Sequence, residues 1–209
     1  MLVKKGAEAN LYLEEWYNLK VIKKVRIPKS YRLHQIDYEI RRSRTVHEAQ
    51  IMSDAKRAGV PTPIIYLIDV KRTTLVMEYV DGPRVKERLN QLPNQDRKVL
   101  CRRIGGLIGQ LHRKGIIHGD LTTSNMILGQ NDKIFFIDFG LAEYSVEVEK
   151  RGVDLHLMKR ALESTHYPHA KECFTSIITG YASVVTKKNA EEVVKRVREI
   201  AQRGRYSGT

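Results

Sequence analysis

The sequence has few cysteines, no long apolar run and a shortage of acidic residues. Only two cysteines occur in 209 residues, Cys101 and Cys173, and they lie far apart in helix-like surroundings. This small number excludes a disulfide-rich scaffold, and we expect two buried free thiols in a reducing cytoplasm. No apolar run reaches the ~18 residues that a membrane span needs, and the N-terminus has no apolar signal-peptide segment. We therefore expect a cytoplasmic protein with no membrane partner.

The shortage of acidic residues leaves a strongly basic chain. Lysine and arginine number 37 against 24 aspartates and glutamates, which gives a net charge of +13. An excess of this size favours polyanionic partners, nucleic acid above all, although solubility alone could account for it. With 42% hydrophobic residues the chain can bury a core, either as one large domain or as two small lobes.

Two stretches near the middle of the chain combine apolar strands with acidic and amide side chains. Asp120 and Asn125 precede the first strand, Met126–Leu128, and Asp138 follows the second, Ile134–Ile137. The residues between the strands are rich in turn formers, which predicts a hairpin. A hairpin holds its ends together, so we expect Asn125 to lie close to Asp138.

This arrangement of oxygen-bearing side chains is typical of magnesium-dependent phosphoryl transfer. Magnesium takes oxygen ligands, usually one or two protein groups together with substrate phosphates. We expect Asn125 and Asp138 to hold Mg²⁺, and Asp120 to orient a nucleophile and accept its proton. The order H-G-D-L-T-T-S-N and then D-F-G resembles the signature of protein kinases. The resemblance implies a minimal two-lobed α+β kinase-like fold, with a β-rich N-lobe at 1–80 and a helical C-lobe at 81–209.

A kinase-like N-lobe should carry a lysine to the nucleotide phosphates. Lys23 and Lys24 are both candidates, and strand alternation puts Ile22 on the same face as Lys24. We favour Lys24, because Ile22 then faces the base. A long helix follows and stops at Gly59-Val-Pro61. Its Glu48 occupies the position from which a kinase helix pairs with the strand lysine.

The remaining parts of a nucleotide pocket are also recognisable. Two further strands are expected at 64–70 and 74–80, where Met77 would guard the back of the pocket. The backbone of Glu78, Tyr79 and Val80 would meet adenine. Between the first two strands, however, the chain offers only Gly6-Ala-Glu-Ala-Asn10. With a single glycine, fewer backbone amides can approach the phosphates closely.

The C-terminal half reads as helical. Apolar residues recur with helical period over Asn94–Lys114, where Gly105 and Gly106 cost about 1 kcal/mol each unless close packing requires them. The segment Leu141–Asp154 is expected to be short and charged. Three helices are predicted after it, the last of them capped by Asn189: His156–Leu162, Ala170–Tyr181 and Asn189–Gln202.

Three departures from ordinary protein kinases narrow the class. Gly119 replaces the arginine that usually reads a phosphorylated activation loop, so switching by loop phosphorylation is not expected. No A-P-E follows D-F-G, and little chain remains after Asp138. We therefore expect a truncated C-lobe whose peptide-binding platform is absent or reduced. The small-molecule kinases that share H-G-D usually carry much more chain after the motif.

Several longer segments are similar to one family. They are Lys24-Val-Arg-Ile-Pro-Lys-Ser-Tyr-Arg32, Arg44-Thr-Val-His-Glu-Ala49 and Gly152-Val-Asp-Leu155. Together with H-G-D and the small size, they resemble the small RIO-related atypical kinases of the KEOPS (EKC) complex. The resemblance runs nearly from end to end, and it carries over Lys24, Glu48, Asp120, Asn125 and Asp138.

The resemblance implies a function. Members of the family bind ATP and Mg²⁺, phosphorylate serine or threonine weakly, and act as an ATPase within KEOPS. That complex makes threonylcarbamoyl-adenosine at position 37 of tRNA. The implied partners are the threonylcarbamoyl-transferase subunit, a small subunit that docks on the N-lobe, and tRNA. The family's arginine-rich tail is modest here, with only Arg203 and Arg205 as weak candidates for RNA contact.

Two other functions remain open from the sequence. A dedicated Ser/Thr kinase with protein substrates would need the peptide platform that this chain lacks or reduces, and it has no need of the +13 charge. A catalytically idle RNA-binding adaptor would have no use for all five of the site residues.

Overall fold

The N-lobe is built on five antiparallel strands in the spatial order β1-β2-β3-β5-β4. In this computed structural model, which describes the backbone of residues 1–206 and the side chains of 1–203, the strands are β1 (Leu2–Lys5), β2 (Ala9–Trp16), β3 (Leu19–Arg26), β4 (Ile65–Asp69) and β5 (Thr74–Glu78). The central strand β3 pairs with β2 and β5, so its inner side chains lie in the middle of the sheet.

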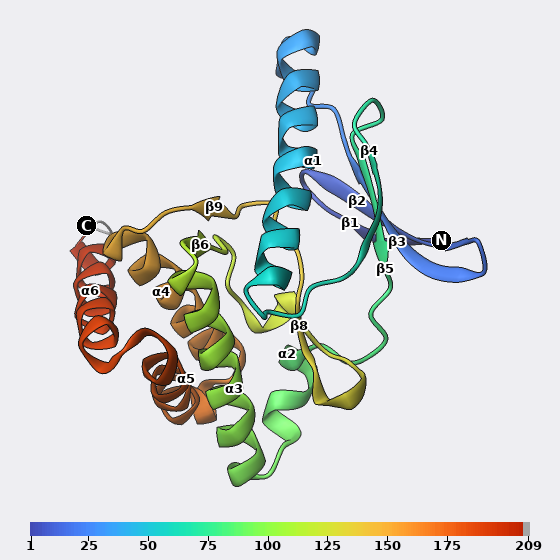
Figure 1. Ribbon diagram of the computed structural model, residues 1–209. Coiled ribbons are helices and arrows are strands. Elements are labelled where there is room, and N and C mark those ends of the chain that lie inside the picture. Colours follow the sequence, from blue (N-terminus) through green and yellow to red (C-terminus); the bar gives the residue numbers. More distant parts are fainter. Residues whose placement is uncertain (207–209) are drawn as a thin grey trace.

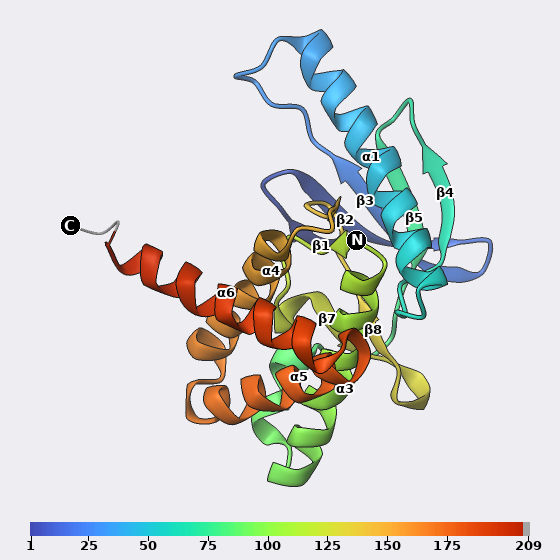
Figure 2. The same ribbon diagram turned by 60° about the vertical axis from the view of Figure 1, so that its left-hand side comes forward.

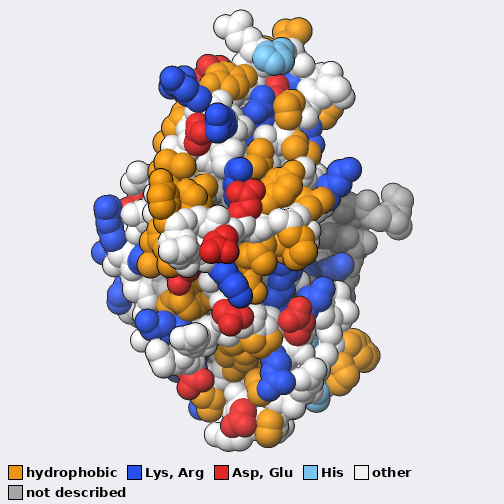
Figure 3. Space-filling model, turned by 90° about the vertical axis from the view of Figure 1, so that its right-hand side faces the viewer, with side chains coloured by type: hydrophobic (Ala, Val, Ile, Leu, Met, Phe, Trp, Pro, Cys, Tyr) orange, Lys and Arg blue, Asp and Glu red, His pale blue; other side chains and the backbone are white. Residues whose placement is uncertain are grey.

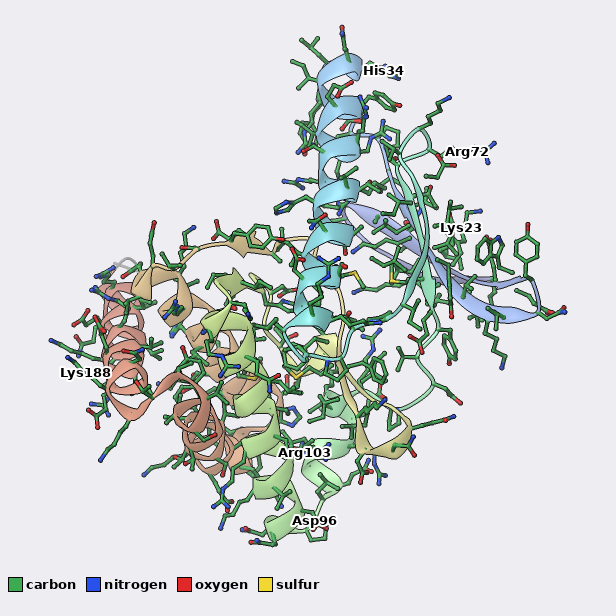
Figure 4. All side chains as sticks on the ribbon, viewed as in Figure 1. Lys23, His34, Arg72, Asp96, Arg103 and Lys188 are labelled. Carbon is green, nitrogen blue, oxygen red and sulfur yellow. The ribbon has the colours of Figure 1, made fainter. Side chains whose placement is uncertain are left out.

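A single long helix, α1 (His34–Arg57), covers one face of this sheet (Figure 1). Its buried apolar side chains are Ala49, Ile51, Met52 and Ala55. His34 marks the outer end of the helix, which projects beyond the sheet and away from the C-lobe (Figure 4). The helix ends where Gly59 takes a φ of +87°, a conformation that favours glycine.

The C-lobe is mainly helical (Figure 2). Its α-helices are α2 (Val85–Arg88), α3 (Asn94–Arg113), α4 (Val148–Thr165), α5 (Ala170–Val185) and α6 (Lys187–Tyr206). Four short 3₁₀ helices are η1 (Leu89–Gln91), η2 (Thr123–Asn125), η3 (Gln130–Asp132) and η4 (Tyr167–His169). The sheet-based N-lobe and helical C-lobe confirm the predicted α+β kinase-like fold, whereas the division at residue 80 stays a prediction.

Two small strand pairs lie where the lobes meet. β7 (Met126–Leu128) pairs with β8 (Ile134–Phe136), which confirms the predicted hairpin. β6 (Ile116–Ile117) pairs with β9 (Glu143–Tyr144). These pairs hold the segments before Asp120 and after Asp138 in fixed positions.

The C-lobe core depends on a very close approach of α3 and α5 (Figure 1). A Cβ atom added to Gly105 would lie 1.9 Å from the carbonyl oxygen of Ile177, and one added to Gly180 would lie 1.9 Å from that of Arg102. Close packing therefore requires both glycines. Gly106 is different, because the nearest atom to an added Cβ is 3.9 Å away.

Two of the predicted helices begin earlier in the structure than the sequence indicated, and the last three helices extend beyond their predicted ends. α4 begins at Val148, well before the predicted His156, because buried Gly152 and Asp154 belong to its inner face and hide the apolar period. α6 begins at Lys187, so Asn189 is not its cap. The N–H of Asn189 instead lies 3.4 Å from the hydroxyl of Thr186, which precedes the helix.

The predicted thiol pair is confirmed: Cys101 and Cys173 are both free and buried. They face each other across α3 and α5.

Among the described helices, none is both long enough and apolar enough to cross a membrane. Hydrophobic side chains lie among charged ones on the side of the sheet away from α1 (Figure 3), and the strands contribute exposed Leu19 and Leu67.

Replacing Gly105 by alanine should destabilise the protein by about 2 kcal/mol, because the added methyl group collides with backbone that cannot move without separating α3 from α5. Gly106→Ala is the matched control. It should stabilise the helix by up to about 1 kcal/mol, since the methyl group makes only ordinary van der Waals contacts, at 3.9 Å or more. Urea unfolding of both variants measures the difference, and equal effects would contradict the close-packing role of Gly105.

Candidate active site

A cavity of 260 Å³ gathers most of the predicted site residues. They lie on β3, α1, β5 and η2, or shortly after β5 and β8. The predicted residues that line the cavity are Ile22, Lys24, Glu48, Met77, Glu78, Tyr79, Asn125 and Asp138. Asp120 lines a neighbouring cavity, which it shares with Lys24 and Asp138.

Lys24 lies at the centre of the site. Its ammonium nitrogen is 2.6 Å from Glu48 Oε1 and 2.6 Å from Asp138 Oδ1. Burial alone would lower the pKa of Lys24, but the two carboxylates outweigh this and hold the pKa above its usual value. The lysine is therefore a fixed positive charge that links Glu48 of α1 to Asp138, the predicted metal ligand that follows β8.

Lys23 points the other way. It lies on the side of the sheet away from α1 (Figure 4) and makes an exposed ion pair with Glu14 at 3.4 Å. Of the two lysines that the sequence left open, the structure thus brings Lys24 into the cavity. The alternation of side chains along β3 accounts for this difference.

Arg26 is a second cation on Glu48, which the sequence reasoning missed. Its Nη2 atom lies 2.6 Å from Glu48 Oε2, while Lys24 holds the other carboxylate oxygen. Arg26 and Glu48 are 5% and 1% exposed. A buried carboxylate with two such partners is held far more firmly than one with a single lysine. Arg26 lies two residues after Lys24 on the same strand, so strand alternation could have placed both side chains on the same face.

Asn125 and Asp138 fit the role of magnesium ligands. The side-chain amide nitrogen of Asn125 donates to Asp120 Oδ2 at 2.8 Å, which leaves the side-chain oxygen Oδ1 of Asn125 as an acceptor. The Asp138 side chain is 39% exposed, and Lys24 engages only one of its oxygens. The backbone N–H of Ile137 donates to the carbonyl of Asn125 at 3.0 Å and keeps the two residues adjacent. This oxygen donor set suits Mg²⁺ completed by phosphates.

Asp138 remains ionised and conformationally constrained. Burial raises its pKa, but Lys24 outweighs this effect and the net pKa lies below the usual value. Its φ of +64° is an uncommon conformation for a residue with a side chain. Such backbone strain is frequent where a side chain must be aimed at a ligand.

Asp120 is positioned by Asp154, a buried acid of α4 that the sequence reasoning did not assign to the site. Asp154 accepts hydrogen bonds from the backbone N–H groups of His118 and Gly119 at 2.8 and 2.9 Å. His112 Nε2 lies 3.2 Å from the same carboxylate. Burial raises the pKa of Asp154, but His112 and the other donors outweigh this and lower it. An acid among buried apolar positions of a helix was the missed signal.

Gly119 is required by this turn. Its φ is +77°, and an added Cβ would lie 2.2 Å from the carbonyl oxygen of Leu141. A residue with a side chain, such as the arginine of ordinary kinases, does not fit this conformation without moving the backbone.

The expected adenine contact is restricted. The N–H of Glu78 already donates to the carbonyl of Ile64 at 2.8 Å, and the N–H of Tyr79 to that of Lys20 at 3.3 Å. Adenine would therefore have to use other polar groups of this connecting segment. Met77 and Ile22 supply apolar lining for a base.

The two arginines of the C-terminal tail, Arg203 and Arg205, were predicted only as weak candidates for RNA contact. The guanidinium of Arg203 lies 3.0 Å from Glu149 of α4. The side chain of Arg205 lies outside the described residues. Contact of these two arginines with RNA stays a prediction.

These features define a protein of the kinase class, and comparison with known families agrees. The model of the protein kinase domain family matches residues 10–175. The chain is 48% identical to KEOPS complex subunit Bud32 of Pyrococcus abyssi, over 98% of this chain and 96% of that protein. It is 41% identical to a probable serine/threonine-protein kinase BUD32 homolog of Archaeoglobus fulgidus, over 99% and 96%. The chain therefore belongs to the Bud32 family of protein kinases.

Some relatives are longer. The chain is 44% identical to a probable bifunctional tRNA threonylcarbamoyladenosine biosynthesis protein of Methanothermobacter thermautotrophicus, over 99% of this chain but only 36% of that protein. Together these relatives confirm the predicted resemblance to the small kinase family of the KEOPS complex.

Replacing Asp154 by asparagine should lower the free energy of unfolding by about 3 kcal/mol, because buried donors lose their charged acceptor. A carboxylate whose pKa is lowered in the folded state adds stability above its unfolded pKa of about 3.9 and loses it as the pH falls through the folded value. The difference from wild type should therefore be constant near neutral pH and shrink below about pH 4.

Chemical unfolding from neutral to acidic pH measures this difference. Asp96→Asn, at an exposed position in the first turn of α3 (Figure 4), is the control and should cost at most about 1 kcal/mol, the contribution of its charge to the helix N-terminus. A penalty for Asp154→Asn that persists undiminished at low pH would contradict the assignment.

Proposed function

We propose that the protein is a Mg²⁺- and ATP-dependent phosphotransferase that acts chiefly as the ATPase subunit of KEOPS in threonylcarbamoyl-adenosine (t6A37) modification of tRNA. In this proposal Lys24 binds the phosphates and Glu48 positions Lys24. Asn125 and Asp138 hold Mg²⁺, which neutralises phosphate charge when bound, and Asp120 accepts a proton from the attacking oxygen. Ile22, Met77, Glu78 and Tyr79 surround the base.

One observation carries the proposal. The ammonium of Lys24 lies 2.6 Å from both Glu48 and Asp138, and the predicted magnesium ligands lie in the same cavity. An arrested site would not require a lysine, a positioning glutamate and two oxygen ligands in one place. This arrangement argues against the catalytically idle adaptor.

The names of the relatives support the proposed partners. The Pyrococcus protein is named as a KEOPS subunit, and the longer relatives are named for threonylcarbamoyladenosine synthesis. Together with the family resemblance, these names support the threonylcarbamoyl-transferase subunit as one partner and a small subunit on the N-lobe as another. The net charge of +13 supports an interaction with tRNA within the complex. The substrate and the two free thiols favour the cytoplasm.

A dedicated Ser/Thr protein kinase is the second candidate, since the Archaeoglobus relative is named a probable serine/threonine-protein kinase. Transfer to a protein hydroxyl and transfer to water use the same five residues. The two functions differ in the acceptor and in the response to partners.

Following γ-labelled ATP with Mg²⁺ tests the proposal, with and without tRNA and the transferase subunit. Label should appear mainly as free phosphate, and its release should rise with the partner or with tRNA. Asp138→Ala should reduce turnover at least about a hundredfold while the fold remains, because the variant lacks a metal ligand at a partly exposed position. Label mainly on a protein would favour the kinase instead, and no turnover in any mixture would favour the adaptor.

The two lysines provide a paired test of the site. Lys24→Ala should abolish nucleotide turnover, because it removes the cation between Glu48 and Asp138. Lys23→Ala should leave turnover within about twofold of wild type, since it removes only an exposed ion pair. Steady-state rates of ATP hydrolysis show which lysine is required. An inactive Lys23→Ala variant together with an active Lys24→Ala variant would reverse the assignment.

A further inference from the structure

The loop between β1 and β2 is fixed by residues of the β3–α1 region. The carbonyl of Ala7 accepts a hydrogen bond from the ammonium of Lys29. The carbonyl of Glu8 accepts one from the backbone N–H of Ile27 at 3.1 Å. The segment after β3 therefore supports the tip of a loop that contains only one glycine, Gly6.

The side chain of Glu8 reaches across to α1. Nη1 of Arg44 lies 2.6 and 2.5 Å from the two carboxylate oxygens of Glu8. Nη1 of Arg26 lies 3.7 Å from one of them. The hydrogen bond from Arg44 lowers the pKa of Glu8, so the carboxylate is ionised at neutral pH. Arg26 thus stands between Glu8 of the loop and Glu48 of the active site.

The same loop borders the cavity in which phosphates would react. Glu8 and Gly6 line one side of this 350 Å³ space, and Asp120 and Asp138 line the other. Arg26 and Lys24 also line it. A displacement of the loop would therefore widen this space, and the ion pair between Glu8 and Arg44 opposes such a displacement.

The two ends of this chain of ion pairs differ in strength. Arg26 and Glu48 have side chains that are 4% and 1% exposed, so their contact is a fixed part of the core. Glu8 and Arg44 are 43% and 38% exposed, so water competes for their contact. An ion pair that is this exposed is weak enough to break and re-form during turnover.

We propose that Glu8 and Arg44 form a latch that holds the β1–β2 loop over the phosphates of a bound nucleotide and slows nucleotide release. The proposal rests on the proposed ATP-binding function. Glu8 and Arg44 are positioning residues, and Arg26 is the buried support against which they close. In other kinases several glycine amides of this loop contact the phosphates directly. Here the loop has one glycine, and the ion pair with α1 would keep the loop in place instead.

Release of methylanthraniloyl-ADP in the presence of Mg²⁺, chased with unlabelled ATP in a stopped-flow instrument, tests the latch. Glu8→Gln and Arg44→Ala should each speed release about three- to tenfold, in the same direction. The double variant should be no faster than the faster single variant, because both remove one interaction. Arg44→Lys should lie between wild type and Arg44→Ala, since it keeps the charge but replaces the planar guanidinium by a more strongly hydrated ammonium on a different stem.

Ionic strength separates a latch from a general structural effect. Release from wild type should speed up as salt rises, whereas release from Glu8→Gln should respond less. Two matched controls change the net charge equally without touching the latch: Glu15→Gln on β2 and Arg42→Ala on α1, whose own partner is Glu39. Both should release nucleotide at the wild-type rate.

The outcomes are distinguishable. Equal release rates in wild type and all variants would overturn the latch while leaving ATP binding intact. Slower release from Glu8→Gln with faster release from Arg44→Ala would also overturn it, because Glu8 would then act only by repelling phosphate. Failure of the wild-type protein to bind the nucleotide would instead overturn the proposed function itself.

Discussion

The buried carboxylate of Glu48 is the contact on which the site depends. It holds Lys24 with one oxygen and Arg26 with the other, both at 2.6 Å, and Lys24 in turn holds Asp138. Lys24, Arg26 and Glu48 are buried, whereas Asp138 is partly exposed. Removal of Glu48 would leave two buried cations without their shared carboxylate, which costs about 3–5 kcal/mol. The cluster therefore fixes α1, β3 and the segment that carries Asp138 together.

Other contacts make α1 part of the C-lobe as well as the N-lobe. His47 lies 3.1 Å from the carbonyl oxygen of Ala142, and the hydroxyl of Tyr144 donates to Asp54 at 2.5 Å. Both partners belong to the segment that follows Asp138. In many kinases the corresponding helix moves outward when the enzyme is switched off. Here its carboxylate has a second buried cation and its flank has two further contacts, all of which oppose an outward movement of α1.

Local sequence chemistry was enough to locate most of the candidate site. The turn formers between Leu128 and Ile134 gave the hairpin correctly, and the side-chain alternation of β3 selected Lys24 over Lys23. These features depend on neighbours in the chain. Arg26, Asp154 and the Glu8–Arg44 pair were not found, because their partners are distant in sequence and a lone charged residue is usually exposed.

The misplaced start of α4 has the same cause. A helix that buries Gly152 and Asp154 has a polar inner face at that turn, and the apolar period that predicts helices is interrupted there. The carboxylate is buried because it serves backbone N–H groups near Asp120. Functional support of this kind is visible only when the two segments are seen together in space.

A crystal structure with Mg²⁺ and a non-hydrolysable ATP analogue tests the central claim most directly. We expect the metal to contact the side-chain oxygen of Asn125 and the carboxylate of Asp138. We expect Lys24 to contact phosphate while Arg26 keeps Glu48 in place. A nucleotide bound outside this cavity, or a metal held by other residues, would contradict the account.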